Sequence, residues 1–466
     1  MQDSKKKPLP MIFRSWLTIA SSFSIAIAAG GPVSLIFGTC VSGVFYACAG
    51  ITLAELASMY PTAGGQYHFT SILAPERWNR SFAYTCGIIS CLSWTINAAG
   101  CTLLATQLLV ALPQFFNGYE PTKWQMFLIS QALNVFAFAY NVFLIRRTTW
   151  IHQTAFLLTL TTFIVCTILS LARSEKASSA WVWTNFEVNT GLPPGVSFLT
   201  GLTTPCYMYG GLDAALHLAE ETLDAARAVP KALISAVSIG FITGFIFSVA
   251  MAYCIVDIQD LLHEPIPIYK LWRIAMKSNV AGSSFIVILT ILVVFILIAI
   301  MQTSSRLLWS FACDHGLFLS NHLSKLSTRF DDNPVNALVF NSVLILLCGC
   351  LYLGSDTAFN ALVNTFLLMQ MISFAMPAAL LIYRKRSSQF LSRSRPFRVP
   401  GFIGWACNIG TIVAAIIETI FFCFPTTLPV SGESMNYASA VLAVVALIAL
   451  ANWFCYTRKV YQGPRI

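Results

Sequence analysis

The sequence predicts an all-α membrane protein with about twelve transmembrane helices. Of its 466 residues, 57% are hydrophobic and only 10% are charged, whereas soluble domains carry roughly 25% charged residues. A helix of about 20 apolar residues crosses the hydrocarbon core of a bilayer, and the strands of a membrane barrel are shorter, about 10 residues. Windows without Asp, Glu, Lys or Arg cover residues 15–29, 33–54, 81–119, 124–145, 148–172, 188–212, 232–256, 278–305, 333–355, 357–383, 399–417 and 434–457.

Positive charge is distributed unequally between the two predicted sides of the membrane. Cytoplasmic loops of membrane proteins carry an excess of Lys and Arg. With a cytoplasmic N-terminus and twelve spans, the Lys and Arg residues that fall outside are Lys123, Arg173, Lys176, Lys270, Arg273 and Lys277. The other Lys and Arg residues, out of 28 in all, fall inside. The net charge of +9 therefore indicates topology rather than nucleic-acid binding, and it places both termini in the cytoplasm.

The first spans are short or tightly turned. Ser15 and Trp16 open span one, which is rich in small residues, and Gly30-Gly31-Pro32 ends it. Small side chains let membrane helices approach one another closely. Spans two to five occupy the next four windows. The turn at 61–67 between spans two and three contains Pro and Gly, which favour a defined bend, so we expect a structural or gating loop there.

Span six contains the clearest interruption. Pro205 lacks a backbone N–H and disrupts a helix, and each of Gly210 and Gly211 weakens a helix by about 1 kcal/mol. Tyr207 and Tyr209 add rings and hydroxyls between them. Irregular backbone at membrane depth is tolerated where it lines a cavity or is buried in protein. The segment is therefore either an unwound substrate site or a packing kink. Short or interrupted helices at matching positions of two halves indicate a transporter site, and spans one and six have this relation.

Four further residues have both a functional and a structural interpretation. Asp213 and His217 are four residues apart, on one face of a helix, and either act in coupling or simply lie where the helix reaches the cytoplasm. Glu418 is a lone acid inside span eleven. It is either a proton-coupling site or a group hydrogen-bonded to a neighbouring helix. Trp94 of span three either contacts a cationic substrate or is an aromatic residue that packs against other helices or lies at the membrane interface.

Two loops are predicted to lie at the membrane surface. The outer loop 257–277 alternates apolar and charged residues, which favours a short surface helix. The loop 384–398 carries six Lys and Arg residues. We expect it to fix the topology and to contact anionic lipids.

Three motifs, in order along the chain, resemble those of one transporter family. They are ELASMYPTAGGQY at 55–67, YGGLDAALHLAEE at 209–221 followed by AVPK at 228–231, and SRLLWSFACDHGL at 305–317. They are similar to the second-helix, sixth-helix and eighth-helix signatures of the amino acid–polyamine–organocation superfamily. Within it, the chain resembles the fungal amino acid/choline transporters, which include GABA and choline permeases.

The resemblance implies a fold of five plus five inverted helices, with helices one and six discontinuous and two helices appended. It implies no covalent cofactor and no metal. The divisions that follow are a cytoplasmic tail at 1–10, a first repeat with a shortened helix one at 11–173, a second repeat at 174–384, a basic loop with helices eleven and twelve at 385–457, and a cytoplasmic tail at 458–466.

The resemblance also implies that exposed main chain at the two helix breaks holds the substrate. The helix-one break is expected near Ser15-Trp16 and the helix-six break at Cys206–Gly211. The expected substrate-binding residues are Ser15, Trp16, Trp94, Cys206, Tyr207, Met208, Tyr209, Gly210 and Gly211. The expected coupling or gating residues are Asp213, His217 and Glu418.

The function expected is secondary active transport, proton-coupled, of an amino acid, GABA, choline or a related amine by alternating access. The partners expected are this small-molecule substrate, protons and the lipid bilayer, with no nucleic acid. The alternative is a non-transporting or shortened transporter-like membrane sensor or subunit, which the few residues before Ser15 favour. No nucleophile–base arrangement predicts an enzyme. We expect the plasma membrane, with the vacuole or another endomembrane as the alternative.

Overall fold

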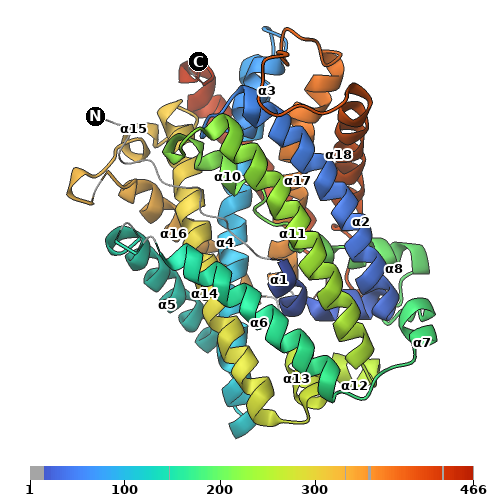
Figure 1. Cartoon of the computed structure of the whole chain (residues 1–466). Coiled ribbons are helices and arrows are strands. Elements are labelled where there is room, and N and C mark those ends of the chain that lie inside the picture. Colours follow the sequence, from blue (N-terminus) through green and yellow to red (C-terminus); the bar gives the residue numbers. More distant parts are fainter. Residues whose placement is uncertain are drawn as a thin grey trace.

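The protein is helical throughout the part of the chain that the structure describes. That part of the computed structural model comprises residues 15–145, 147–148, 150–330, 332–354, 358–432 and 435–464, apart from the side chains of residues 221 and 358–360. Within these residues there is no β-strand, and only an isolated bridge joins Ser327 to Asn333. The helices form one bundle, whose long members run from one end of the molecule to the other (Figure 1). The prediction of an all-α membrane protein is confirmed.

Ten helices among the described residues are long and apolar enough to cross a membrane. They are α2 (Phe23–Met59), α4 (Asn79–Asn117), α5 (Lys123–Phe143), α6 (Ile151–Arg173), α11 (Ala225–Cys254), α14 (Asn279–Cys313), α16 (Val335–Gly354), α17 (Ala358–Tyr383), α18 (Gly401–Phe421) and α19 (Ala438–Asn452), which reaches spanning length because helical structure continues to Val460. Most of these bounds lie within a few residues of a charge-free window, because charged and turn residues end a helix where it leaves the apolar layer.

Two of the twelve predicted spans are not separate long helices. Span one consists of α1 (Ser15–Ser21) and the beginning of α2, which continues into span two across non-helical backbone at Gly30 and Gly31. Span six is divided into α8 (Pro194–Gly201), α9 (Thr203–Tyr207) and α10 (Ala214–His217). The count of ten thus differs from twelve because α2 includes two predicted spans on either side of the non-helical residues Gly30 and Gly31, and another span is broken.

The connections contain short helices. These are α3 (Gln66–Leu73), α7 (Ser179–Thr184), α12 (Ile258–Leu262), α13 (Pro267–Met276), α15 (Ser320–Leu323), α20 (Arg458–Val460), two 3-10 turns at Ala219–Glu221 and Thr328–Phe330, and a π turn at Trp453–Thr457. The prediction of helical structure in the outer loop 257–277 is confirmed by α12 and α13.

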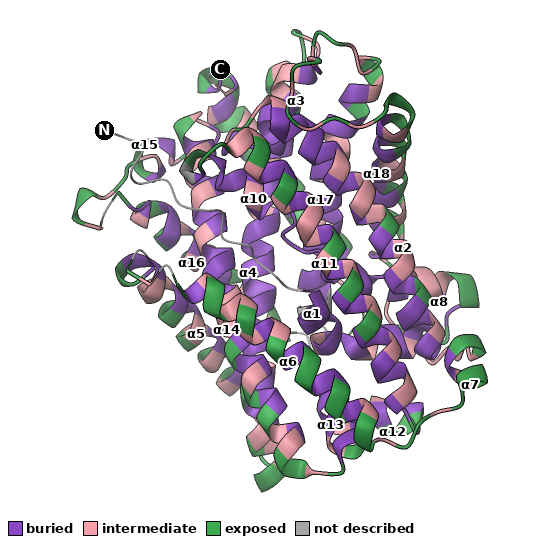
Figure 2. Ribbon diagram, viewed as in Figure 1, coloured by how far each residue is buried: buried purple, intermediate pink, exposed green. Residues whose placement is uncertain are grey.

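The helices pack with their apolar residues on the outside as well as the inside. Helix α2 packs along α11, and α4 contacts both α14 and α17. Helix α1 lies inside the bundle, part-way along its height (Figure 1). Buried residues form the inward faces and exposed residues the outward faces and the ends (Figure 2). Several outward residues are large and apolar, among them Val135 (63% exposed), Phe402 (76%) and Leu447 (66%). An outer surface of this kind is stable against lipid rather than water.

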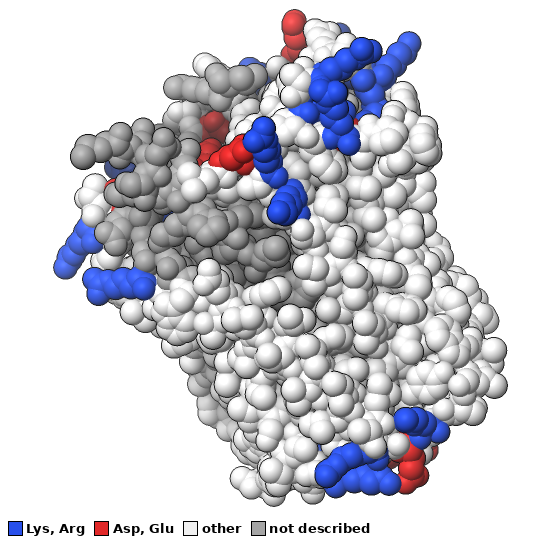
Figure 3. All heavy atoms as spheres, viewed as in Figure 1, with Lys and Arg blue, Asp and Glu red and all other residues white. Residues whose placement is uncertain are grey.

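On the face that Figure 3 shows, Lys, Arg, Asp and Glu gather toward the top of the view, at its left margin and along its lower edge. A wide white band from the centre to the right-hand side, between the upper and lower groups, carries none. Charge at the centre of a bilayer is costly. The band therefore marks the part of the surface that faces hydrocarbon.

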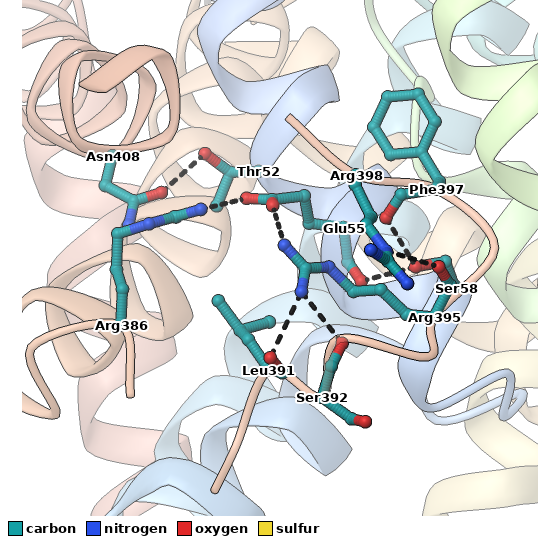
Figure 4. A network of polar contacts seen from close by, with 10 residues as sticks. All are labelled: Thr52, Glu55, Ser58, Arg386, Leu391, Ser392, Arg395, Phe397, Arg398 and Asn408. Carbon is teal, nitrogen blue, oxygen red and sulfur yellow. Dashed lines mark hydrogen bonds and ion pairs between the residues drawn. The ribbon is translucent and has the colours of Figure 1, made fainter. Parts of the chain in front are cut away.

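The loop 384–398 contacts protein more than the sequence suggests. Glu55, near the end of α2, is fully buried. Its carboxylate lies 2.5 Å from a guanidinium nitrogen of Arg386 and 2.7 Å from one of Arg395 (Figure 4). Arg395 also donates to the carbonyl groups of Leu391 and Ser392. We call Glu55, Arg386 and Arg395 the Glu55 clamp, since they fix the loop to α2.

Further hydrogen bonds hold the same loop against α3 and the end of α2. Arg384 donates to the carbonyl oxygens of Leu73 (2.7 Å) and Ala74 (2.9 Å). Tyr60 donates its hydroxyl to the carbonyl of Phe390 at 2.9 Å. Arg386 and Arg395 therefore pair with protein instead of facing the surface, and contact of the loop with anionic lipid through its other basic residues remains a prediction. The exposed basic residues of the loop are Lys385, Arg393 and Arg398.

Candidate functional site

The sixth span is interrupted between α9 and α10. Residues 208–213 form turns, in which the N–H of Tyr209 donates to Cys206 and that of Gly210 donates to Tyr207, three residues back rather than four. Gly211 has a φ of +84°, a conformation that side chains with a Cβ rarely adopt. The whole stretch is buried, so it lies within the protein and not against lipid. The predicted break begins two residues later than expected, because Cys206 and Tyr207 still belong to α9.

A second interruption lies beside the first. Helix α1 ends at Ser21 and α2 begins at Phe23, with Ser22 at a φ of −113° and a ψ of 20° between them. The hydroxyl of Thr204 in α9 donates to the carbonyl of Ser22 at 2.7 Å. The break that we expected near Ser15-Trp16 partly concerns residues before 15, which lie outside the described part of the chain. Ser15 and Trp16 themselves begin α1.

A small cavity separates α1 and α9 from α4 and α14. Its lining residues are Leu17, Thr18, Ser21, Cys101, Leu104, Tyr207, Val293 and Ile296. None of these eight side chains is Asp, Glu, Lys or Arg. The volume open to the centre of a water-sized sphere is about 10 Å³, which is roughly the minimum for one water molecule. The cavity is thus small and lies directly against the end of α9.

Tyr207 is the predicted binding residue that lines this cavity. The other lining residues were not singled out from the sequence, because apolar and hydroxyl residues in a membrane span give no signal of their own. Their spacing does give a partial signal. Cys101 and Leu104, like Val293 and Ile296, are three apart and so share one helix face.

Trp16 fixes α1 in the bundle. It is fully buried, and its indole N–H donates to the carbonyl of Thr159 in α6 at 3.2 Å. Its ring lies 5.2 Å from that of Phe247 in α11 and 6.2 Å from that of Phe163 in α6. Trp16 thus positions the helix that carries Leu17, Thr18 and Ser21, and it is not itself among the lining residues.

Asp213 is the centre of a buried hydrogen-bond network. One carboxylate oxygen accepts from Gln66 of α3 at 2.6 Å and from Trp94 of α4 at 3.1 Å. The other accepts from Gln370 of α17 at 2.9 Å. A ring nitrogen of His217 lies 3.1 Å from the first oxygen. The network joins the end of the broken span to three other helices and compensates a charge that is only 1% exposed.

Trp94 therefore lies at the network and beside the break. Its ring is so close to Gly211 that a Cβ there would approach it to 3.0 Å. His217 extends the network to the turn between α2 and α3, since its second ring nitrogen is 2.9 Å from the carbonyl oxygen of Ala63. The backbone N–H of Ala63 donates to Glu220 at 3.3 Å. Helix α10 is thus docked on this turn from two sides.

Glu418 lies on the other side of α9, beside Cys206 and Tyr46. It is fully buried, and neither of its carboxylate oxygens has a hydrogen-bond partner among the described residues. The ring of Tyr46 stacks on that of Tyr209, with centroids 4.9 Å apart and planes at 17°. Cys206 of α9 and Tyr46 of α2 lie beside the Glu418 carboxylate, so both interpretations of Glu418, a proton-coupling site and a group held by neighbouring helices, remain predictions.

The comparisons with known proteins agree with this architecture. A model of the amino acid permease family matches residues 11–447. The chain belongs to the amino acid permease family. It is 30% identical to the choline transporter of Saccharomyces cerevisiae over 96% of this chain and 80% of that protein. It is 30% identical to the swainsonine transporter swnT of Arthroderma benhamiae over 94% of this chain and 87% of the relative.

A third relative comes from a plant. Amino-acid permease BAT1 of Arabidopsis thaliana is 28% identical over 96% of this chain and 89% of its own length. The present chain, as a member of the amino acid permease family, is therefore an integral membrane transporter for amino acids or amines. The resemblance inferred from the three motifs is confirmed. The division into two inverted repeats and the roles of single residues remain predictions.

Proposed function

We propose that this permease is a secondary active transporter that moves a small amine or zwitterionic amino acid by alternating access. The observation that carries the proposal is the buried interruption at residues 208–213, which begins where Tyr207 of α9 lines the central cavity. Broken helices at membrane depth are typical of transporter binding sites. The choline transporter and amino-acid permease among the relatives support this substrate class for the chain.

The cavity determines how such a substrate is recognised. Because its eight lining side chains carry no charge, the charged groups of a substrate meet main-chain groups and hydroxyls. The carbonyl groups of residues 208–213 are not all held in a regular helical ladder, so they suit an ammonium group. The Tyr207 ring offers a face for a quaternary ammonium, and Thr18 and Ser21 offer hydroxyls. A choline- or GABA-sized solute therefore fits the chemistry of the cavity better than a dibasic or diacidic one.

The volume of the cavity indicates which step the structure represents. A space for about one water is too small for an amino acid, so the surrounding helices have to separate before a substrate enters. Helices α1 and α9, which are linked through the hydrogen bond from Thr204 to the carbonyl of Ser22, are the parts that we propose to move. The present arrangement is therefore one in which this cavity holds no substrate.

We further propose that transport is coupled to protons and that the transporter acts in the plasma membrane with both termini in the cytoplasm. Asp213, His217 and Glu418 are the candidate coupling groups, because each is buried beside the interruption. The excess of Lys and Arg on one predicted side supports the orientation. Ser15, Trp16, Trp94, Cys206, Met208, Tyr209, Gly210 and Gly211 are proposed to shape or position the site around Tyr207.

Uptake by the purified full-length protein in liposomes tests the proposal. The probes are radiolabelled choline, GABA and alanine, and we expect accumulation of at least one of them. Gly211→Ala is expected to abolish uptake, because a φ of +84° strains any residue with a Cβ and the new Cβ would press on Trp94. Gly100→Ala is the matched control on α4, where a Cβ would meet its nearest neighbour at an ordinary 3.7 Å.

Two results would count against the proposal. Uptake that is unaffected by Gly211→Ala would separate transport from the interruption. No uptake of any probe by a correctly inserted wild-type protein would favour the sensor or subunit alternative.

A further inference from the structure

The hydrogen bonds of His217 determine how many protons this residue and its partner hold. One ring nitrogen lies 2.9 Å from the carbonyl oxygen of Ala63, and the other lies 3.1 Å from a carboxylate oxygen of Asp213. A carbonyl only accepts hydrogen bonds, so the nitrogen facing Ala63 carries a hydrogen. A neutral imidazole has one donor and one acceptor nitrogen, and an imidazolium has two donors.

The second contact therefore needs one more proton. An ionised Asp213 only accepts, so the nitrogen facing it donates and His217 is an imidazolium. If Asp213 is protonated instead, its hydroxyl donates to the ring. In both cases the pair holds one proton more than neutral histidine with a carboxylate. In the fully deprotonated pair, two lone pairs would face each other at 3.1 Å and one of the two hydrogen bonds would be lost.

The surroundings favour the form in which the proton is on His217. Gln66, Trp94 and Gln370 donate three hydrogen bonds to the Asp213 carboxylate, and donors of this kind stabilise the charged form. The side-chain oxygens of both glutamines have no partner among the described residues. Both amides are thus committed to Asp213 through their nitrogens. A fixed carboxylate in turn stabilises the positive charge on the ring.

The shared proton acts on a junction between two parts of the fold. His217 and Glu220 belong to the segment beyond the interruption, and both bond to Ala63 in the turn between α2 and α3. The same turn approaches α10 closely at Gly65, where a Cβ would lie 3.2 Å from Leu216 and 3.3 Å from His217. Loss of one hydrogen bond from so close a junction weakens the docking of α10 directly.

Other titratable groups lie near His217 and Asp213 and interact electrostatically with this part of the structure. Asp213 interacts electrostatically with Cys86 of α4 and Tyr46 of α2. Glu220 interacts with Cys313 of α14. No Lys or Arg makes an ion pair with Asp213 among the residues described here, so His217 is the cation that the geometry supplies to Asp213.

We propose that His217 carries the coupling proton and that this proton holds α10 docked on Ala63. The inference rests on the proposed proton-coupled transport and names the site of the proton within it. With the proton bound, the half-helix beyond the break is fixed to the turn between α2 and α3. When the proton leaves, the contact to Ala63 or to Asp213 fails and α10 is released. Gln66, Trp94 and Gln370 are positioning residues, since they orient Asp213 toward the ring.

Backbone hydrogen exchange tests the junction without any substrate. The full-length protein in phosphatidylcholine nanodiscs is compared at pH 5.5 and 8.5, with correction for the intrinsic exchange rate. Protection at residues 63–65 is expected to fall by at least about tenfold at the higher pH, as loss of one charge-assisted hydrogen bond implies. His217→Gln is expected to remove this pH dependence. His68→Gln, at a buried histidine of α3 outside the network, is the control and is expected to behave as the wild type.

Transport provides the second measurement. In liposomes with an imposed pH gradient, His217→Gln is expected to lose gradient-driven accumulation of the choline, GABA or alanine probe while still exchanging it at equal pH. Asp213→Asn is expected to remove the pH dependence of hydrogen exchange at residues 63–65, because an amide N–H can donate to a neutral imidazole and the contact then needs no additional proton. A purely structural role would change neither the pH profile nor the ratio of accumulation to exchange.

Each outcome decides the matter. Protection that does not depend on pH in the wild type overturns the inference, and so does His217→Gln with a normal pH profile. If Glu418→Gln abolishes gradient-driven accumulation and His217→Gln does not, the proton belongs to Glu418 and the inference is wrong while the proposed function stands. If no probe accumulates under a pH gradient, the proposal of proton coupling is wrong. The hydrogen-exchange measurement at residues 63–65 then still decides whether a proton on His217 holds α10 on the turn between α2 and α3.

Discussion

Removal of the Glu55 carboxylate is the sharpest test of how the fold is held together. Glu55 is fully buried, and each of its two oxygens pairs with a different arginine. The Arg386 and Arg395 side chains are only 6% and 9% exposed. In Glu55→Gln both guanidinium groups lose their counter-charge without gaining access to water. Breaking a buried ion pair by removing one partner costs about 3–5 kcal/mol, and we expect a loss of this size.

Single arginine substitutions are expected to cost less. In Arg386→Gln the carboxylate keeps Arg395 and one strong hydrogen bond, so the loss is about 1–3 kcal/mol. The same holds for Arg395→Gln. The two arginines share one partner, so the effects of the two substitutions are not additive. A double-mutant cycle is therefore expected to show a coupling energy.

The assay is SDS-induced unfolding of the purified protein in mixed micelles, followed by tryptophan fluorescence. Glu175→Gln is the matched control, since Glu175 pairs with Lys277 at the surface and its side chain is 79% exposed. Exposed ion pairs contribute little to the free energy of unfolding, so this variant is expected to unfold at the same SDS midpoint as the wild type. Equal midpoints for Glu55→Gln and Glu175→Gln would show that the clamp does not contribute to stability and would refute the reasoning.

Two further substitutions test the cavity and the anchoring of α1. Val293→Phe fills a space of about one water. Uptake of the choline, GABA or alanine probe is therefore expected to fall below about a tenth of the wild-type rate, while membrane insertion is unchanged. A tenfold loss of rate corresponds to an increase of about 1.4 kcal/mol in the activation barrier. Val287→Phe on the outward face of the same helix (43% exposed) is expected to leave uptake intact, and equal effects of the two would exclude the cavity as the substrate path. Trp16→Phe removes the hydrogen bond to Thr159 and leaves a cavity where the fully buried indole was, so it is expected to lower the free energy of unfolding by more than about 1 kcal/mol in the same SDS assay. Trp124→Phe, at a position 57% exposed, is expected to have no effect, and identical shifts would contradict the role assigned to Trp16.

Most of the fold could be predicted from the sequence because lipid imposes simple rules. The charge-free window 124–145 became α5 (Lys123–Phe143), and 357–383 became α17 (Ala358–Tyr383). The interruption at Pro205–Asp213 was also visible, since proline and paired glycines act locally on a helix. The end of span one at Gly30 and Gly31 was visible for the same reason, and the non-helical backbone at these two residues separates the helical parts of predicted spans one and two.

The contacts that build the site could not be predicted in the same way. Asp213 was noticed as an acid, but its partners Gln66 and Gln370 are neutral residues 147 and 157 positions away. Nothing in their local sequence marks them. Arg386 and Arg395 were interpreted as lipid-facing because Glu55 lies 331 and 340 positions before them. Long-range pairing of this kind is set by the packing of helices, which periodicity and composition do not specify.

The hydrogen bond between Thr204 and Ser22 links α9, just before the interruption of the sixth span, to the residue that separates α1 from α2. Displacing one of these segments without the other would break this contact of 2.7 Å, at a net cost of about 1 kcal/mol. A rearrangement that carries both segments together avoids that cost.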